Sequence, residues 1–68
     1  MTTERMEAYA LEEQDLIFVN GQVYRVIAIT PTDEGYRFQL ADEEGNLASM
    51  VIEDTTKVPV VIDNYTTV

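Results

Sequence analysis

Four turn sequences, each two to five residues long, divide residues 15–62 into five β-rich runs. The first turn, Asn20-Gly21, is the strongest short hairpin signal, because both central residues of the favoured turn need a positive φ angle. Connections this short leave no room for a crossover helix, so the runs are expected to pair as antiparallel strands. The expected strands are Leu16–Val19, Gln22–Thr30, Tyr36–Ala41, Leu47–Ile52 and Val58–Ile62.

The apolar pattern of these runs predicts an all-β fold, in which a five-stranded antiparallel meander curls into a small barrel. In the run Gln22–Thr30, apolar residues point both ways, with Ile27 and Ile29 on one face and Tyr24 and Val26 on the other. This pattern is typical of a central strand that is covered on both faces or curled within a barrel.

The chain is long enough for one domain. We expect residues 1–14 to form an N-terminal arm, residues 15–62 to form the barrel, and residues 63–68 to form a C-terminal tail. Either Thr2 or Thr3 is placed to cap a short helical turn through Arg5–Ala8. A helix this short is marginal in water unless it docks on the rest of the chain.

The residue types that are missing restrict the chemistry. The 68 residues include no cysteine and no histidine, which removes disulfides, thiolate metal sites and the commonest general base. Ser49 has no histidine partner for a nucleophilic triad. We therefore expect a non-enzymatic protein without cofactor or metal. No run of 18 apolar residues and no signal-like N-terminus is present, so we expect a cytoplasmic protein that does not bind membranes.

Charge is the most unusual bulk property of the chain. Thirteen acidic residues against four basic ones give a net charge of −9. Nucleic acid is bound chiefly through Lys and Arg, so direct binding to DNA or RNA is not expected. One interpretation is that the charge only keeps a small domain soluble. The other is that it is directed at a basic protein partner.

Part of the chain resembles the small SH3-like and KOW-like barrels, a class that includes the N-terminal domain of translation elongation factor P. The matching positions are Asp15, Gly21, Tyr24-Arg25-Val26, Gly35–Leu40 and the turn Asp42–Asn46. The resemblance implies a small barrel fold. The loop Thr30–Gly35 is acidic and lacks lysine, so the modified basic residue and the RNA-contacting basic loops of that class have no counterpart here. In size and acidity the chain also resembles small bacteriophage proteins, which include virion components and inhibitors of host machinery.

The candidate partner-binding residues are the acids of two turns and a tyrosine near each end of the chain. They are Asp33, Glu34, Asp42, Glu43, Glu44, Tyr9 and Tyr65. For the acids the alternative is a solvated turn. The spacing of Asp42–Glu44 does not match a calcium-binding loop.

Two functional hypotheses follow from these features. The first is a protein-binding module, plausibly a phage-encoded adaptor or inhibitor, that docks a larger partner through its acidic loops or an exposed sheet edge. Pro59 lacks an N–H group, which predicts either the beginning of a strand or an edge at Pro59–Ile62. If the partner surface normally binds nucleic acid, the protein would be a nucleic-acid mimic. The second is a homo-oligomeric structural or assembly protein of a virion, with the tails ordered against neighbouring copies.

Overall fold

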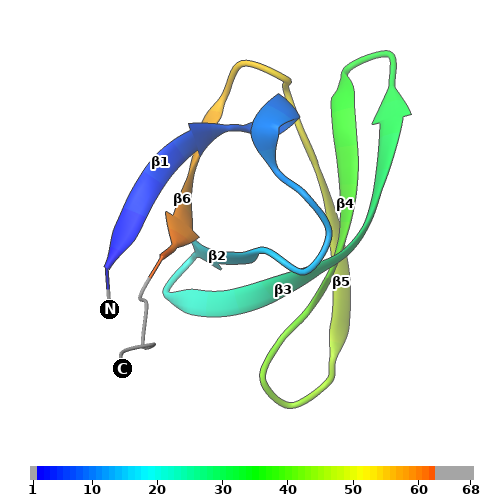
Figure 1. Cartoon of the computed structure of the whole chain (residues 1–68). Coiled ribbons are helices and arrows are strands. Elements are labelled where there is room, and N and C mark those ends of the chain that lie inside the picture. Colours follow the sequence, from blue (N-terminus) through cyan, green and yellow to red (C-terminus); the bar gives the residue numbers. More distant parts are fainter. Residues whose placement is uncertain (1, 63–68) are drawn as a thin grey trace.

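The protein is described by a computed structural model that covers residues 2–62. These residues form one antiparallel sheet of six strands in the order β1-β6-β2-β3-β4-β5 (Figure 1). The elements are β1 (Thr3–Glu7), the 3-10 turn η1 (Ala8–Ala10), β2 (Leu16–Val19), β3 (Gln22–Thr32), β4 (Gly35–Ala41), β5 (Leu47–Ile52) and β6 (Lys57–Val61). The expected all-β, antiparallel class is confirmed, but the expected count of five strands is wrong. No helix in this part of the chain is long and apolar enough to cross a membrane.

The additional strand is β1, which occupies the region where a helical turn was expected. It pairs with β6 from Thr3 opposite Val61 to Glu7 opposite Lys57. A few residues cannot sustain a helix alone, whereas a strand beside β6 gains partners for its backbone groups. Leu11, in the loop after η1, is buried. Residues 3–11 therefore contribute a strand to the sheet and side chains to its core.

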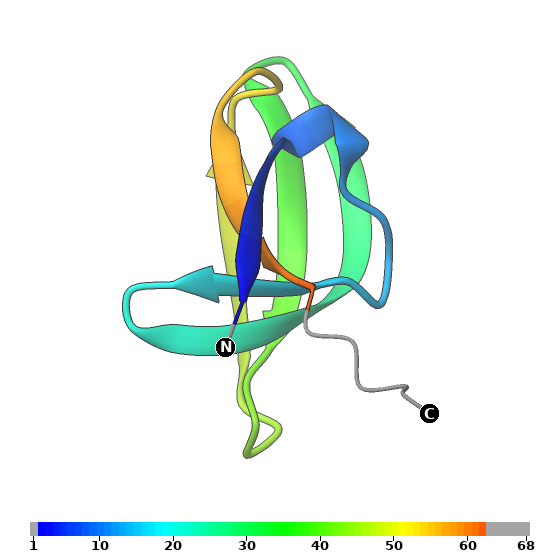
Figure 2. The same ribbon diagram turned by 60° about the vertical axis from the view of Figure 1, so that its left-hand side comes forward.

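The long strand β3 bends in its middle, so that its first half runs across the direction of β4 (Figure 2). The register with β4 shifts between Val26 and Ala28, which leaves Ile27 as an extra residue, 39% exposed. A bulge of this kind bends a strand and changes which side chains face inward. Val26 is buried and Ile29 packs against the core. The two-sided apolar pattern therefore reflects the bulge, and the prediction that β3 is a central strand is confirmed.

The core lies inside the curve of the sheet and is built only from apolar side chains. Phe38, Ile17 and Val26 are its largest fully buried members. Tyr36 packs at the edge of the core, with its ring centroid 6.4 Å from that of Phe38. No polar or charged residue is buried among residues 2–62. The full set of buried residues is Ala8, Leu11, Ile17, Val26, Phe38, Leu40, Val58 and Val60.

The strand that contains Pro59 is not an edge of the sheet, contrary to expectation. β6 lies between β1 and β2, and Pro59 is paired with Arg5 of β1. On its other side β6 is joined to β2 only through Ile17 and Val60, so no long ladder there needs the missing N–H. The expected closure into a barrel is not seen: the sheet of the described residues is open, because its two edge strands, β1 and β5, do not pair with each other.

Candidate partner-binding surface

The structure brings two acidic turns together at one end of β4 and β5. Asp33 and Glu34 lie in the β3–β4 turn, and Glu53 and Asp54 follow β5. All four line one open depression of about 420 Å³. We call these four residues the Asp33 group. Two of its members, Glu53 and Asp54, were not among the expected site residues.

Gly35 explains why these turns lie so close. Its φ angle is +140°, and a Cβ atom built at this position would collide with the backbone oxygen of Ile52 and lie 2.7 Å from the Cα of Glu53. Only a residue without a side chain allows the start of β4 to rest directly on the end of β5. The glycine therefore sets the spacing between the two pairs of acids.

A second acidic group lies in the β4–β5 turn, which we call the Asp42 loop (residues 42–46). The Oδ1 atom of Asp42 accepts hydrogen bonds from the backbone N–H groups of Glu44 at 2.9 Å and Asn46 at 2.8 Å. These bonds, led by that from Asn46, lower the pKa of Asp42 below its usual 3.8. Asp42 thus holds the turn in shape, while Glu43 and Glu44 are exposed.

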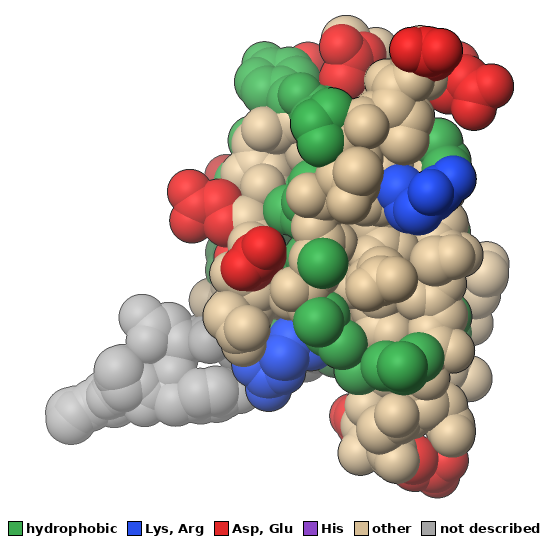
Figure 3. Space-filling view, turned by 90° about the vertical axis from the view of Figure 1, so that its right-hand side faces the viewer, with side chains coloured by type: hydrophobic (Ala, Val, Ile, Leu, Met, Phe, Trp, Pro, Cys, Tyr) green, Lys and Arg blue, Asp and Glu red, His purple; other side chains and the backbone are tan. Residues whose placement is uncertain are grey.

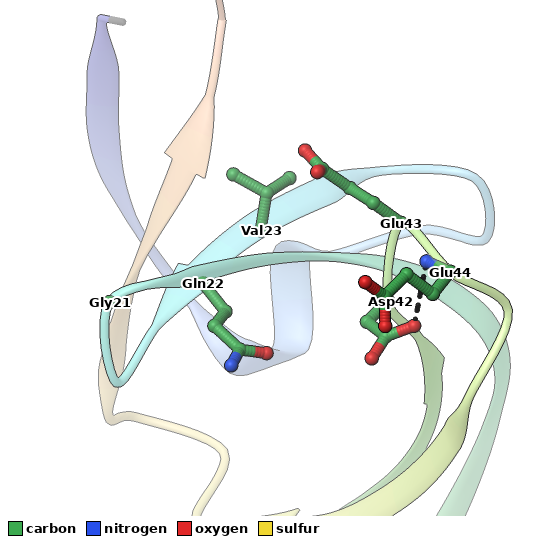
Figure 4. A pocket seen from close by; sticks show the side chains of 6 residues that line it. All are labelled: Gly21, Gln22, Val23, Asp42, Glu43 and Glu44. Atoms are coloured by element: carbon green, nitrogen blue, oxygen red, sulfur yellow. Dashed lines mark hydrogen bonds between the residues drawn. The ribbon is translucent and has the colours of Figure 1, made fainter.

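The Asp42 loop faces the β2–β3 turn across an open depression of about 320 Å³ (Figure 4). Gln22 extends toward the side of β3 where Asp42 and Glu44 lie, whereas Glu43 extends on the opposite side with Val23. The carboxylates of this loop therefore do not converge on one point. Within residues 2–62, no cluster of three or more acidic side chains is arranged to hold a metal ion.

The acidic residues expected from the sequence thus form two separate groups. Asp33 and Glu34 precede β4 and the Asp42 loop follows it, so the seven residues of β4 lie between them. At about 3.3 Å per residue, the two groups are about 20 Å apart along the strand. A partner that contacts both groups must span this distance.

Tyr9 lies beside the Asp33 group. Its side chain is 57% exposed, and its backbone N–H donates to the carbonyl oxygen of Asp54 at 3.2 Å. Its hydroxyl donates to Oε1 of Glu7 at 2.9 Å, and this bond together with the charge of Glu7 raises the pKa of Tyr9 above 10.0. Tyr9 therefore supplies an exposed ring at this acidic end. Tyr65, the other expected tyrosine, lies outside the described residues.

Between the two acidic groups lies the convex side of β3, β4 and β5, which we call the outer face. Its exposed apolar side chains include Leu47 at 76% and Val51 at 44% exposure. Arg37 stands opposite Val51 in the neighbouring strand. Figure 3 shows acidic side chains at both ends of this side of the molecule and more of them toward the left of the view, while apolar and basic side chains lie over the rest. By register, the outer face comprises Arg25, Ala28, Thr30, Arg37, Gln39, Ala41, Leu47, Ser49 and Val51, none of them acidic.

Sequence reasoning recognised Leu47–Ile52 as a strand but did not assign it to a surface. The available signal was the absence of any charged residue from this run. The importance of this missing charge depends on the strand order, because uncharged strands are common in the interior of a sheet and uncommon at its edge. A scan against models of protein families found no match to the chain, and a search of curated proteins found none either.

Proposed function

We propose that this protein is a non-enzymatic binding module that docks a basic surface of a larger protein partner. The observation that carries the proposal is the outer face, where exposed Leu47 and Val51 lie between two acidic groups about 20 Å apart. Apolar side chains supply contact area, and flanking charges supply orientation and a faster encounter with a partner of opposite charge.

The carboxylates suit attraction better than acid–base catalysis. None is buried within residues 2–62, so water solvates them. A general acid would need a raised pKa, which requires burial or a close second carboxylate. Their placement at exposed strand ends supports a role in long-range attraction.

The strand order supports assignment to the SH3-like barrels, with β1 as an addition. Without β1, the order is β6-β2-β3-β4-β5. In this order β2 to β5 form a meander, and β6, the last strand in the chain, lies beside β2. Within that assignment we favour a phage-encoded adaptor or inhibitor acting in the host cytoplasm. Where the partner's basic surface normally holds nucleic acid, the two acidic groups would compete with its phosphates.

The test is capture of partner proteins from bacterial lysate at low salt, with variants matched for charge. Glu34→Gln, Glu43→Gln and Glu53→Gln together remove three charges from the two acidic groups. We expect this triple variant to lose most of the captured protein, and the parent to lose it as salt rises. The control triple variant, Glu4→Gln, Glu12→Gln and Glu13→Gln, should capture as the parent does. Equal capture by the two triple variants would contradict the proposal.

A homo-oligomeric structural protein is the second candidate, favoured by the uncharged edge strand β5. Such an edge has unpaired backbone groups that a neighbouring copy can bond. Light scattering coupled to size exclusion separates the two functions. A stable oligomer at low salt would favour the structural role, and a monomer would favour the binding module.

A further inference from the structure

The outer edge of β5 carries backbone groups that no other strand of the described sheet bonds. Among residues 2–62, β5 has β4 as its only neighbouring strand, so the N–H and C=O groups of alternate residues point away from this sheet. Its six residues, Leu47–Ile52, include no charge and no proline. Charged residues and proline are among the devices by which proteins close an edge to another strand.

The side chains of β5 define what an added strand would meet. Leu47, Ser49 and Val51 stand on the outer face, with Leu47 and Val51 exposed. On the inner face Met50 and Ile52 are partly buried against the core. An added strand with apolar residues at alternate positions would cover Leu47 and Val51 on one side.

A second copy of the chain suits this edge less well than a basic segment does. The Asp42 loop precedes β5 and Glu53 and Asp54 follow it, so β5 is acidic at both ends. Whether two β5 strands paired parallel or antiparallel, acids of one copy would lie beside acids of the other. Like charges placed this way oppose association. The same arrangement attracts a strand with basic residues at both ends.

We infer that β5 binds an extended peptide segment of a partner protein by strand addition, and that this segment has alternating apolar residues flanked on both sides by lysine or arginine. Backbone hydrogen bonds to β5 supply affinity, and the apolar and basic positions supply selectivity. This inference rests on the proposed function and names the partner's recognised element. A folded basic surface without a free strand would not satisfy it.

The probe is a synthetic peptide whose centre alternates valine and threonine and whose two ends carry lysine. Binding is measured by fluorescence anisotropy at low and high salt. We expect saturable binding that weakens by about tenfold when the ends carry no charge, and further when they carry glutamate. Methylation of alternate backbone nitrogens in the peptide keeps its charge but removes donors, and it should abolish binding if hydrogen bonds to β5 hold the peptide.

Two matched variants of the protein test whether the peptide binds at β5 or at β1. Ser49→Lys places a positive charge in the middle of β5, and Thr3→Lys does the same at an exposed position of β1. We expect Ser49→Lys to weaken binding of the lysine-ended peptide by about tenfold or more, and Thr3→Lys to leave it unchanged. Equal effects of the two variants would overturn the inference.

Two further results would overturn the inference without touching the proposed function. In the first, the methylated peptide binds as well as its parent, which would mean attraction by charge without strand addition. In the second, no peptide binds while partner capture still depends on Glu34, Glu43 and Glu53, which would mean docking of a folded surface. Loss of both peptide binding and charge-dependent capture would overturn the two proposals together.

Discussion

The two edges of the sheet, β1 and β5, differ sharply in charge. Three of the five residues of β1 are charged: Glu4, Arg5 and Glu7. None of the six residues of β5 is charged. Charged side chains on an edge discourage another strand from pairing with it. β1 is thus protected in the usual way, and β5 is not.

At β5 the charges lie beyond the ends of the strand instead of along it. The Asp42 loop stands before the strand, with Glu53 and Asp54 after it. Acids beside an apolar strand limit its aggregation. They also leave the backbone of the strand open to a partner of opposite charge. The comparison teaches that the position of the charges on an edge strand, along it or beyond its ends, decides which partners the strand excludes.

The largest expected effect tests whether both edges depend on one core. Phe38→Ala removes the largest fully buried side chain, next to β5 and far in strand order from β1. We expect a loss of about 3–5 kcal/mol in the free energy of unfolding, enough to unfold many domains of this size. Chemical denaturation measures the loss. Val58→Ala, in β6, should lower stability in the same single transition. Separate transitions for the two halves of the sheet would break the comparison of two edges of one structure.

A smaller loss is expected from Gly35→Ala, which tests the contact that positions the end of β5. The added methyl group would meet the backbone of Ile52 and Glu53, at a φ angle that alanine rarely adopts. We expect destabilisation of about 2–3 kcal/mol. Gly45→Ala is the control, because Gly45 also has a positive φ but open space around it, so its cost should be about 1 kcal/mol. Thermal unfolding measures both, and equal losses would show that the contact with β5 does not matter.

Self-association gives a still smaller effect that sharpens the contrast between the edges. If flanking acids prevent β5 from pairing with another copy, screening them should permit it. We expect a monomer at low salt and weak, concentration-dependent association at high salt, measured by light scattering. Ser49→Lys should suppress that association, and Thr3→Lys should not. Association at high salt that both variants reduce equally would place the contact elsewhere.

The smallest predicted effect concerns the turn that leads into β5. Hydrogen bonds lower the pKa of Asp42 in the folded state, so its carboxylate stabilises the fold above the usual pKa of 3.8 and loses this effect as the pH falls through the lowered value. Asp42→Asn should therefore reduce stability at neutral pH and approach parity with the parent in strong acid. Denaturation across this pH range measures the difference. A difference that does not change with pH would exclude an electrostatic origin.

Much of the strand content was predictable from local signals. Asn20-Gly21 marked the β2–β3 hairpin, and the alternation in Tyr36–Ala41 marked β4, because turn chemistry and a period of two act over a few residues. β1 escaped prediction because Thr3–Glu7 has no apolar alternation, and its strand form depends on the distant β6. The bulge at Ile27 was hidden for a similar reason, since register is set by the partner strand.

The candidate site was predictable only in part. The exposed acids of the β3–β4 and β4–β5 turns follow from composition. Their separation by about 20 Å does not, because it depends on β4 lying between them. That Glu53 and Asp54 belong to the same acidic group could not be predicted either, because it depends on the close contact between Gly35 and the end of β5. The sequence predicted an edge at Pro59 from a local rule, whereas the strand order places the two edges at β1 and β5.

Backbone amide NMR, recorded as the lysine-ended peptide is added to the labelled protein, tests the central claim most directly, because it reports on both edges at once. The account predicts that the amide signals of Leu47–Ile52 shift on binding, and that alternate amides become protected from exchange with solvent. Those of Thr3–Glu7 should stay in place. Shifts confined to the acidic turns, or equal shifts along β1 and β5, would contradict the claim that β5 is the edge kept open for a partner.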